Sequence, residues 1–145
     1  MNILISGCLL GLSCRYDGQS KAYPLVEELC RRHEVVPVCP EQLGGLPTPR
    51  TPAERQGGRV VTKTGGDVTE QYLRGAAEAV RLAQLLGCSV AVLKERSPSC
   101  GSGEIYDGTF TGTLTDGFGT AAEALRAAGI RVLGESQLAA FLAEN

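Results

Sequence analysis

Four short apolar runs recur along the chain, separated by longer amphipathic or irregular segments. They cover residues 2–6, 34–38, 89–93 and 130–133. Each run is too short for a helix and is rich in Ile, Val or Leu, as expected of a strand buried on both faces. The pattern therefore predicts four buried strands.

Four amphipathic segments between and after these runs predict helices over residues 22–33, 69–86, 120–128 and 135–143. Pro24 is tolerated in the first turn of the first helix, and Gly87 is suited to end the second. The expected apolar face of the first helix comprises Leu25, Val26, Leu29 and Cys30. The expected inward face of the second comprises Tyr72, Leu73, Ala76, Val80 and Ala83.

Residues 39–58 form the least regular part of the sequence, with four prolines and four glycines. An irregular segment of this length in a compact domain usually builds a site. Residues 59–66 predict a small hairpin or strand edge, and residues 105–114 predict a turn-rich strand pair around Asp107-Gly108.

Alternating strands and helices predict an α/β fold with three layers. We expect one domain over residues 1–145, with a mostly parallel, four-strand, Rossmann-like sheet, helices on both faces and a small β-hairpin region. Cys8, Cys39 and Cys100 each follow the carboxyl end of a different predicted strand. Ligands bind at that edge of open parallel sheets, so the topology should bring the three thiols to one site.

Thiolates are soft ligands that suit iron–sulfur clusters and zinc. The chain lacks the CxxC spacing that is common in closed structural zinc sites. Three loop cysteines that leave one position open suit a [4Fe–4S] cluster with a free iron, or a catalytic metal. The alternative is that all three are ordinary core cysteines.

The other cysteines and the single histidine have simpler interpretations. Cys30 and Cys88 are expected in the core. Cys14, in the same loop as Cys8, is a fourth ligand, a redox partner or an ordinary loop thiol. His33 ends a predicted helix, where a structural interaction with the helix dipole is expected. The segment from Gly117 to Ala122 has GxGxxA spacing, but it favours a plain helix start with exposed amides over a dinucleotide site.

Composition narrows the possible partners. The 14 basic and 16 acidic residues give a net charge of −2 without a basic stripe, and there is no Trp, so a nucleic-acid partner is not expected. Neither a secretory signal nor a membrane-length apolar stretch is evident, so we expect a cytoplasmic protein with reduced cysteines. We expect a monomer or a small homo-oligomer.

Five segments carry a resemblance to a known family. They are SGCLLG at residues 6–11, CRYDG at 14–18, CPEQLGGLPTPR at 39–50, GDVT at 66–69 and SPSCG at 97–101. The chain resembles, over nearly its whole length, the thiouracil desulfidases, a family formerly described as a domain of unknown function. Gly7 stands where alanine is more usual in that family.

The resemblance implies a [4Fe–4S] cluster held by Cys8, Cys39 and Cys100, with the fourth iron free to take the sulfur of a thiolated pyrimidine. It also implies that Glu41 and Ser97 are the catalytic carboxylate and hydroxyl. For Glu41 the alternative is a solvated loop carboxylate, and for Ser97 a turn hydroxyl. Arg50 would contact a polar substrate or form a surface ion pair.

Three other functions stay open at this point. A non-catalytic iron–sulfur or zinc scaffold, or a sulfur carrier, would have every metal position filled by protein, for example through Cys14. Sulfur insertion into RNA should require a basic surface, and thiol-redox chemistry usually uses a CxxC pair. The sequence shows neither feature, which counts against these two functions.

Overall fold

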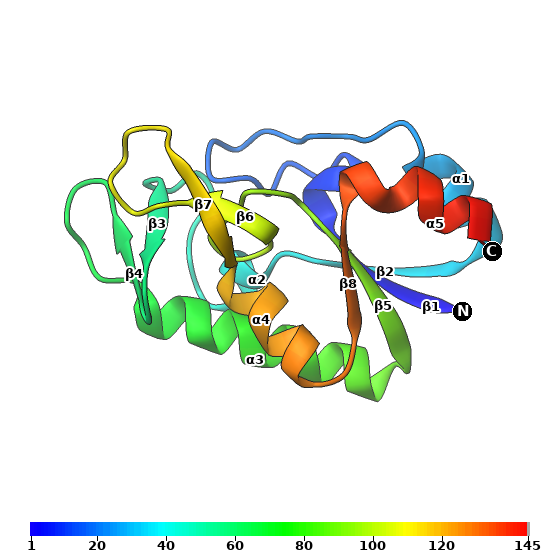
Figure 1. Cartoon of the computed structure of the whole chain (residues 1–145). Helices are drawn as coiled ribbons and strands as arrows, with labels where there is room; N and C mark the ends of the chain where they lie inside the picture. The colour runs from blue at the N-terminus through cyan, green and yellow to red at the C-terminus, as the bar shows by residue number, and fades with distance from the viewer. Residues whose placement is uncertain (145) are drawn as a thin grey trace.

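The computed structural model describes residues 1–144 and has a four-stranded parallel sheet at its centre (Figure 1). The strand order is β2-β1-β5-β8, and every neighbouring pair is parallel. The strands are β1 (Asn2–Ser6), β2 (Glu34–Val38), β5 (Cys88–Leu93) and β8 (Arg131–Gly134). The four predicted strands are confirmed.

Helices cover both faces of this sheet, which confirms the expected three layers (Figure 1). They are α1 (Val26–Arg32), α2 (Pro40–Leu43), α3 (Thr69–Leu85), α4 (Thr120–Ala127) and α5 (Leu138–Glu144). Short 3-10 helices lie at Gly7–Leu10 and Glu135–Gln137.

Alternation along the central strands divides the interior into two cores. Ile3 and Ile5 of β1 face α1 and α5, whereas Leu4 faces α3 and α4. A strand that is covered on both faces must be apolar at successive positions, and this explains the uninterrupted runs in the sequence. The edge strand β2 contains Pro37, and an edge is where a sheet tolerates a residue without an N–H.

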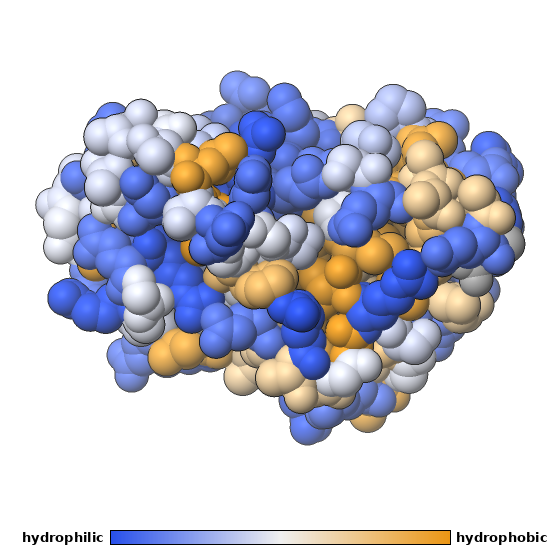
Figure 2. All heavy atoms as spheres, in the orientation of Figure 1, coloured by the Kyte–Doolittle hydropathy of each residue, from blue (hydrophilic) through white to orange (hydrophobic). Residues whose placement is uncertain are grey.

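Two antiparallel hairpins lie beyond the carboxyl ends of the sheet strands (Figure 1). One joins β3 (Ala53–Gln56) to β4 (Arg59–Thr62), and the other joins β6 (Ser102–Tyr106) to β7 (Leu114–Phe118). In the space-filling view, apolar side chains gather beside β8, whereas the hairpin end is mostly hydrophilic (Figure 2).

Several sequence-based expectations need correction. The first helix begins at Val26 rather than residue 22, because Tyr23 N–H donates to Leu9 O (3.0 Å) and Pro24 disfavours a helical residue before it. Cys30 is exposed, not in the core. Leu73, expected to face inward, is 55% exposed, since α3 buries its Tyr72, Ala76 and Ala79 side. Cys88 is buried, as expected.

His33 packs against Phe141 with ring centroids 5.8 Å apart, which fits its structural role. Burial, the N-terminal ammonium and Arg32 lower its pKa, so the structure does not favour the protonated imidazole that an attractive helix-dipole interaction requires. Among residues 1–144, none of the helices has the length and apolar character needed to span a membrane.

Candidate functional site

A cavity of about 590 Å³ opens at the carboxyl ends of β1, β2 and β5. Cys8, Cys39 and Cys100, from three distant parts of the sequence, all line it. Cys14 lines it as well. The structure thus brings together the three thiols that the strand topology predicted, and adds a fourth beside them.

Burial is the largest contribution to the raised pKa values of Cys8 and Cys100. It raises the pKa of Cys8 to about 11, against a lowering effect of Lys94 and a raising effect of Cys39. Burial also raises the pKa of Cys100, and the charges of Glu41, Cys39 and Cys8 raise it further. Because each thiolate opposes ionisation of the next, the group would be stabilised in its ionised form by a positively charged centre.

Cys39 lies at the junction between β2 and α2. Pro40 occupies the first helical position, where its missing N–H costs nothing, and Leu43 N–H donates to Cys39 O (2.9 Å). Two glycines then allow α2 to lie directly on α3. A Cβ on Gly44 would overlap the Gln71 carbonyl, and one on Gly75 would overlap the Pro40 carbonyl.

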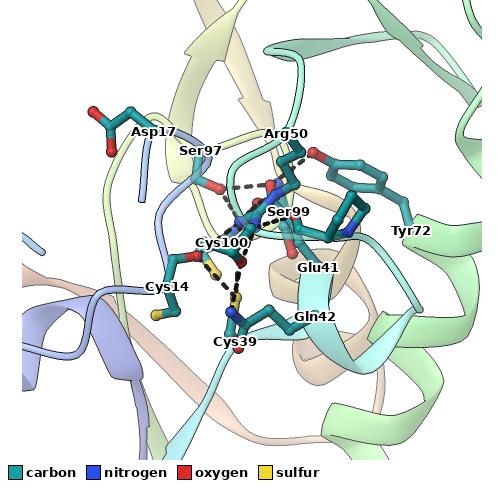
Figure 3. A network of polar contacts seen from close by, with 12 residues as sticks. Cys14, Asp17, Cys39, Glu41, Gln42, Arg50, Tyr72, Ser97, Ser99 and Cys100 are labelled. Atoms are coloured by element: carbon teal, nitrogen blue, oxygen red, sulfur yellow. Dashed lines mark hydrogen bonds and ion pairs between the residues drawn. The ribbon is translucent and has the colours of Figure 1, made fainter. Parts of the chain in front are cut away.

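This close crossing places Glu41 of α2 within reach of Tyr72 of α3 (Figure 3). The Tyr72 hydroxyl donates to Oε1 of Glu41 at 2.6 Å. Burial, and then the charge of Glu41, raises the pKa of Tyr72 above the ordinary tyrosine range, so the hydroxyl stays protonated and can donate. Arg50 Nε donates to Oε2 of Glu41 at 2.9 Å, and Arg50 Nη2 also pairs with that oxygen.

Arg50 uses all five of its N–H groups inside the protein. Besides the two that reach Glu41, Nη1 donates to Pro47 O (3.1 Å) and Thr48 Oγ1 (2.9 Å), and Nη2 donates to Cys14 O (2.9 Å). Its Nη2 also lies 3.9 Å from the sulfur of Cys39. The side chain is only 6% exposed, so its ion pair with Glu41 is buried and the expectation of a surface ion pair was wrong. Arg50 also lines the cavity, and its contact with a polar substrate stays a prediction.

Ser97 shapes the loop that carries Cys100. Its Oγ accepts the N–H groups of Ser99 and Cys100, both at 3.1 Å, and its carbonyl accepts Gly101 N–H at 2.8 Å. The hydroxyl therefore has the turn role that was the alternative at the sequence level. Ser97 also lines the cavity, and its own O–H hydrogen remains available to donate there.

The amino end of α4 supports the same loop. Thr120 N–H donates to Pro98 O (2.9 Å) and Ala121 N–H to Ser99 O (2.9 Å), so the amides expected to be exposed are occupied. Gly119 packs so closely that a Cβ would overlap the Ser99 carbonyl. Gly119, the second glycine of the GxGxxA string, therefore allows the start of α4 to pack against the loop that carries Cys100.

Sequence reasoning missed two further residues of this site. Ser6 forms a hydrogen bond that lowers the pKa of Cys100, and its Oγ accepts Lys94 N–H at 2.9 Å. Tyr72 was assigned only to the apolar face of its helix. A buried tyrosine usually needs a partner for its hydroxyl, and this was the available signal for a polar role.

The donor set suits an iron–sulfur cluster. Cysteine thiolates are the usual ligands of such clusters, and three of them lie in one cavity large enough for a cofactor beside a small substrate. Within residues 1–144, no group of three or more His, Cys, Asp or Glu side chains is arranged to hold a metal ion. A cluster distributes its ligands over several irons, so its cysteines stand farther apart than those around one ion.

The comparisons with known proteins agree with this chemistry. The chain is 45% identical to an uncharacterized protein, YbbK, of Bacillus subtilis (strain 168), over 94% of this chain and 97% of that protein. It matches a solved structure of TudS, named as a [4Fe-4S]-dependent thiouracil desulfidase, with a TM-score of 0.91 and 49% identity; the match covers 96% of this chain and 93% of that one. Residues 3–137 match the 2-thiouracil desulfurase family, and the chain belongs to that family.

Proposed function

We propose that this protein removes sulfur from thiouracil or a related thiolated pyrimidine, using a [4Fe–4S] cluster held by Cys8, Cys39 and Cys100. The observation that carries the proposal is the convergence of three thiols, from the ends of three strands, on one cavity. The family and the likeness to TudS support it.

When bound, the cluster would supply an open, soft iron position that accepts a thione sulfur and polarises the carbon–sulfur bond. Water then adds to the carbon, the carbon–sulfur bond breaks, and the products are the oxo-pyrimidine and hydrogen sulfide. Oxidation states balance, so neither an oxidant nor a reductant is required.

Glu41 would take the proton from the attacking water. Its carboxylate is 13% exposed and lines the same cavity as the three thiols. Arg50 and Tyr72 fix its orientation, and a fixed base needs little reorganisation during the reaction. Ser97 would orient water or substrate through its free O–H hydrogen while its oxygen holds the Cys100 loop.

The first test is anaerobic reconstitution with iron and sulfide. We expect a visible cluster absorbance, four irons per chain, and conversion of thiouracil to uracil with one sulfide released per turnover. A reconstituted cluster without turnover of any thiolated pyrimidine would refute the proposed activity.

Serine variants test the ligand set. Cys8→Ser, Cys39→Ser and Cys100→Ser should lose most of the cluster absorbance and iron. Cys30→Ser is the matched control, because Cys30 is exposed and lies outside the cavity lining. Full iron content in any of the three cavity variants would remove that cysteine from the set.

Glu41→Gln separates chemistry from cofactor binding. The amide is nearly isosteric but cannot take up the proton, so we expect turnover to fall by at least a factor of about 100 while cluster absorbance stays. Wild-type turnover in this variant would remove the role of Glu41 as the base.

A scaffold in which Cys14 fills the fourth iron position is the second candidate. Cys14 lines the same cavity, and burial followed by the charges of Cys39 and Cys8 raises its pKa. If Cys14 is a ligand, Cys14→Ser should change the electron paramagnetic resonance signal of the reduced cluster. An unchanged signal with retained turnover would favour the desulfidase.

A further inference from the structure

Two non-glycine residues of the described chain have a left-handed backbone, Arg96 with φ 69° and Phe110 with φ 58°. Both line the site cavity. A phenylalanine gains no local hydrogen bond from this conformation, which is strained and persists only where its surroundings impose it.

The conformation of Phe110 is held by hydrogen bonds between the loop that contains it and two side chains of β3, Glu54 and Gln56. Oε1 of Glu54, on β3, accepts the N–H groups of Gly108 (2.9 Å) and Phe110 (3.1 Å). Gln56 Nε2, on the same strand, donates to Gly108 O at 2.8 Å. One hairpin thereby holds the connecting loop of the other, and the position of Phe110 is set from outside its own loop.

The side chain of Phe110 has no packing role in the interior. It belongs to neither hydrophobic core, and it is half-buried at the cavity. The other aromatic residues of the cavity lining, Tyr16, Tyr72 and Tyr106, carry a hydroxyl, and Tyr72 is committed to Glu41. Phe110 is thus the wholly apolar ring of the lining.

We propose that Phe110 is a specificity-determining residue whose ring stacks on the face of the pyrimidine. This inference rests on the proposed function, since it names the contact that selects a planar ring among thiocarbonyl compounds. Stacking of a base on an aromatic side chain contributes about 1–3 kcal/mol by alanine substitution. In this role Phe110 contributes to binding of the ring rather than to the chemical step.

The experiment compares Phe110→Ala, Phe110→Leu and Phe110→Trp in the cluster-loaded protein. We expect Ala and Leu to raise the KM for thiouracil roughly 5- to 150-fold with little change in kcat, and Trp to keep the wild-type KM. Uracil binding, followed by ligand-observed NMR, should weaken in Phe110→Ala and Phe110→Leu and stay at the wild-type level in Phe110→Trp. Thioacetamide, which lacks a ring, is the control substrate, and its kcat/KM should be unchanged by all three substitutions.

The outcomes distinguish the inference from the proposed function. If wild-type protein turns over thiouracil but Phe110→Leu has the wild-type KM and uracil affinity, the ring is not a stacking surface and the inference fails. An equal loss of kcat/KM for thioacetamide would overturn it too, since the substitution would then have disturbed the site generally. If the loaded wild-type protein has no desulfidase activity, the proposed function fails, and uracil binding still tests Phe110.

Discussion

Gly75 of α3 lies so close to Pro40 of α2 that a Cβ on Gly75 would overlap the Pro40 carbonyl oxygen. This contact fixes the distance between two helices, and with it the hydrogen bond from Tyr72 to Glu41. A glycine in the middle of a helix is therefore part of the construction of the site.

Gly75→Ala should destabilise the protein. Helix propensity alone would favour alanine by about 1 kcal/mol, whereas overpacking against a backbone carbonyl costs roughly 1–3 kcal/mol or more. We expect a net loss in the free energy of unfolding, measured by urea titration. Ala77→Gly, at an exposed position of the same helix, measures the propensity contribution alone. A Gly75→Ala variant more stable than wild type would contradict the packing argument.

Tyr72→Phe should lower kcat while leaving the cluster absorbance intact, because Glu41 loses one of the donors that fix it. A hydrogen bond to a charged group contributes about 1.5–3 kcal/mol, so the free energy of unfolding should fall by a similar amount. Turnover and urea titration measure the two effects. The control is Tyr106→Phe, in the same cavity lining. Equal effects of both substitutions would argue against a specific role of Tyr72.

Gly119→Ala should reduce the iron bound after reconstitution. A Cβ at this position must displace the Ser99 carbonyl and the Cys100 loop with it. Gly117→Ala is the matched control: its Cβ would meet the end of the Ile105 side chain at 3.3 Å, and a side chain can move. Iron and sulfide content measures the difference. Equal loading of both variants would show that the loop tolerates the shift.

Asp67 gives a prediction for pH. Hydrogen bonds from the Thr69 hydroxyl and N–H, and then from Arg59, lower its pKa from 3.8 to about 2. Since the folded-state pKa is depressed, the stabilisation is present above pH 3.8 and is lost as the pH falls towards 2. The urea midpoint of Asp67→Asn should therefore vary less than that of wild type over this interval. If the urea midpoints of wild type and Asp67→Asn change equally with pH over this interval, the stabilisation by ionised Asp67 is contradicted.

The sheet could be predicted from the sequence because its strands are buried on both faces. Ile3, Leu4 and Ile5 are consecutive apolar residues that serve two different cores, and few other structures require that pattern. The placement of Cys8, Cys39 and Cys100 followed from the rule for parallel strand ends. The helix α2 was missed, since four residues give no periodicity and the surrounding prolines suggest a loop.

The polar part of the site was harder to predict, because its partners are distant in sequence or lie within an irregular segment. Nothing local in the sequence shows that Glu41 meets Tyr72, 31 positions later. For Arg50, a surface ion pair was one of the two expectations, because charged residues of irregular segments usually lie at the surface. The prediction for Cys30 was wrong in the opposite sense: a thiol on the apolar face of a helix was expected to be buried, and it is exposed.

The fully satisfied guanidinium of Arg50 limits how this site can diverge. Any substrate group that sought a hydrogen bond from it would have to displace an internal acceptor, and lysine, with three donors and no planar fork, is no substitute. Redesign towards new thiolated compounds should therefore start from the β3–β4 and β6–β7 hairpins beside the cavity and leave Arg50 in place.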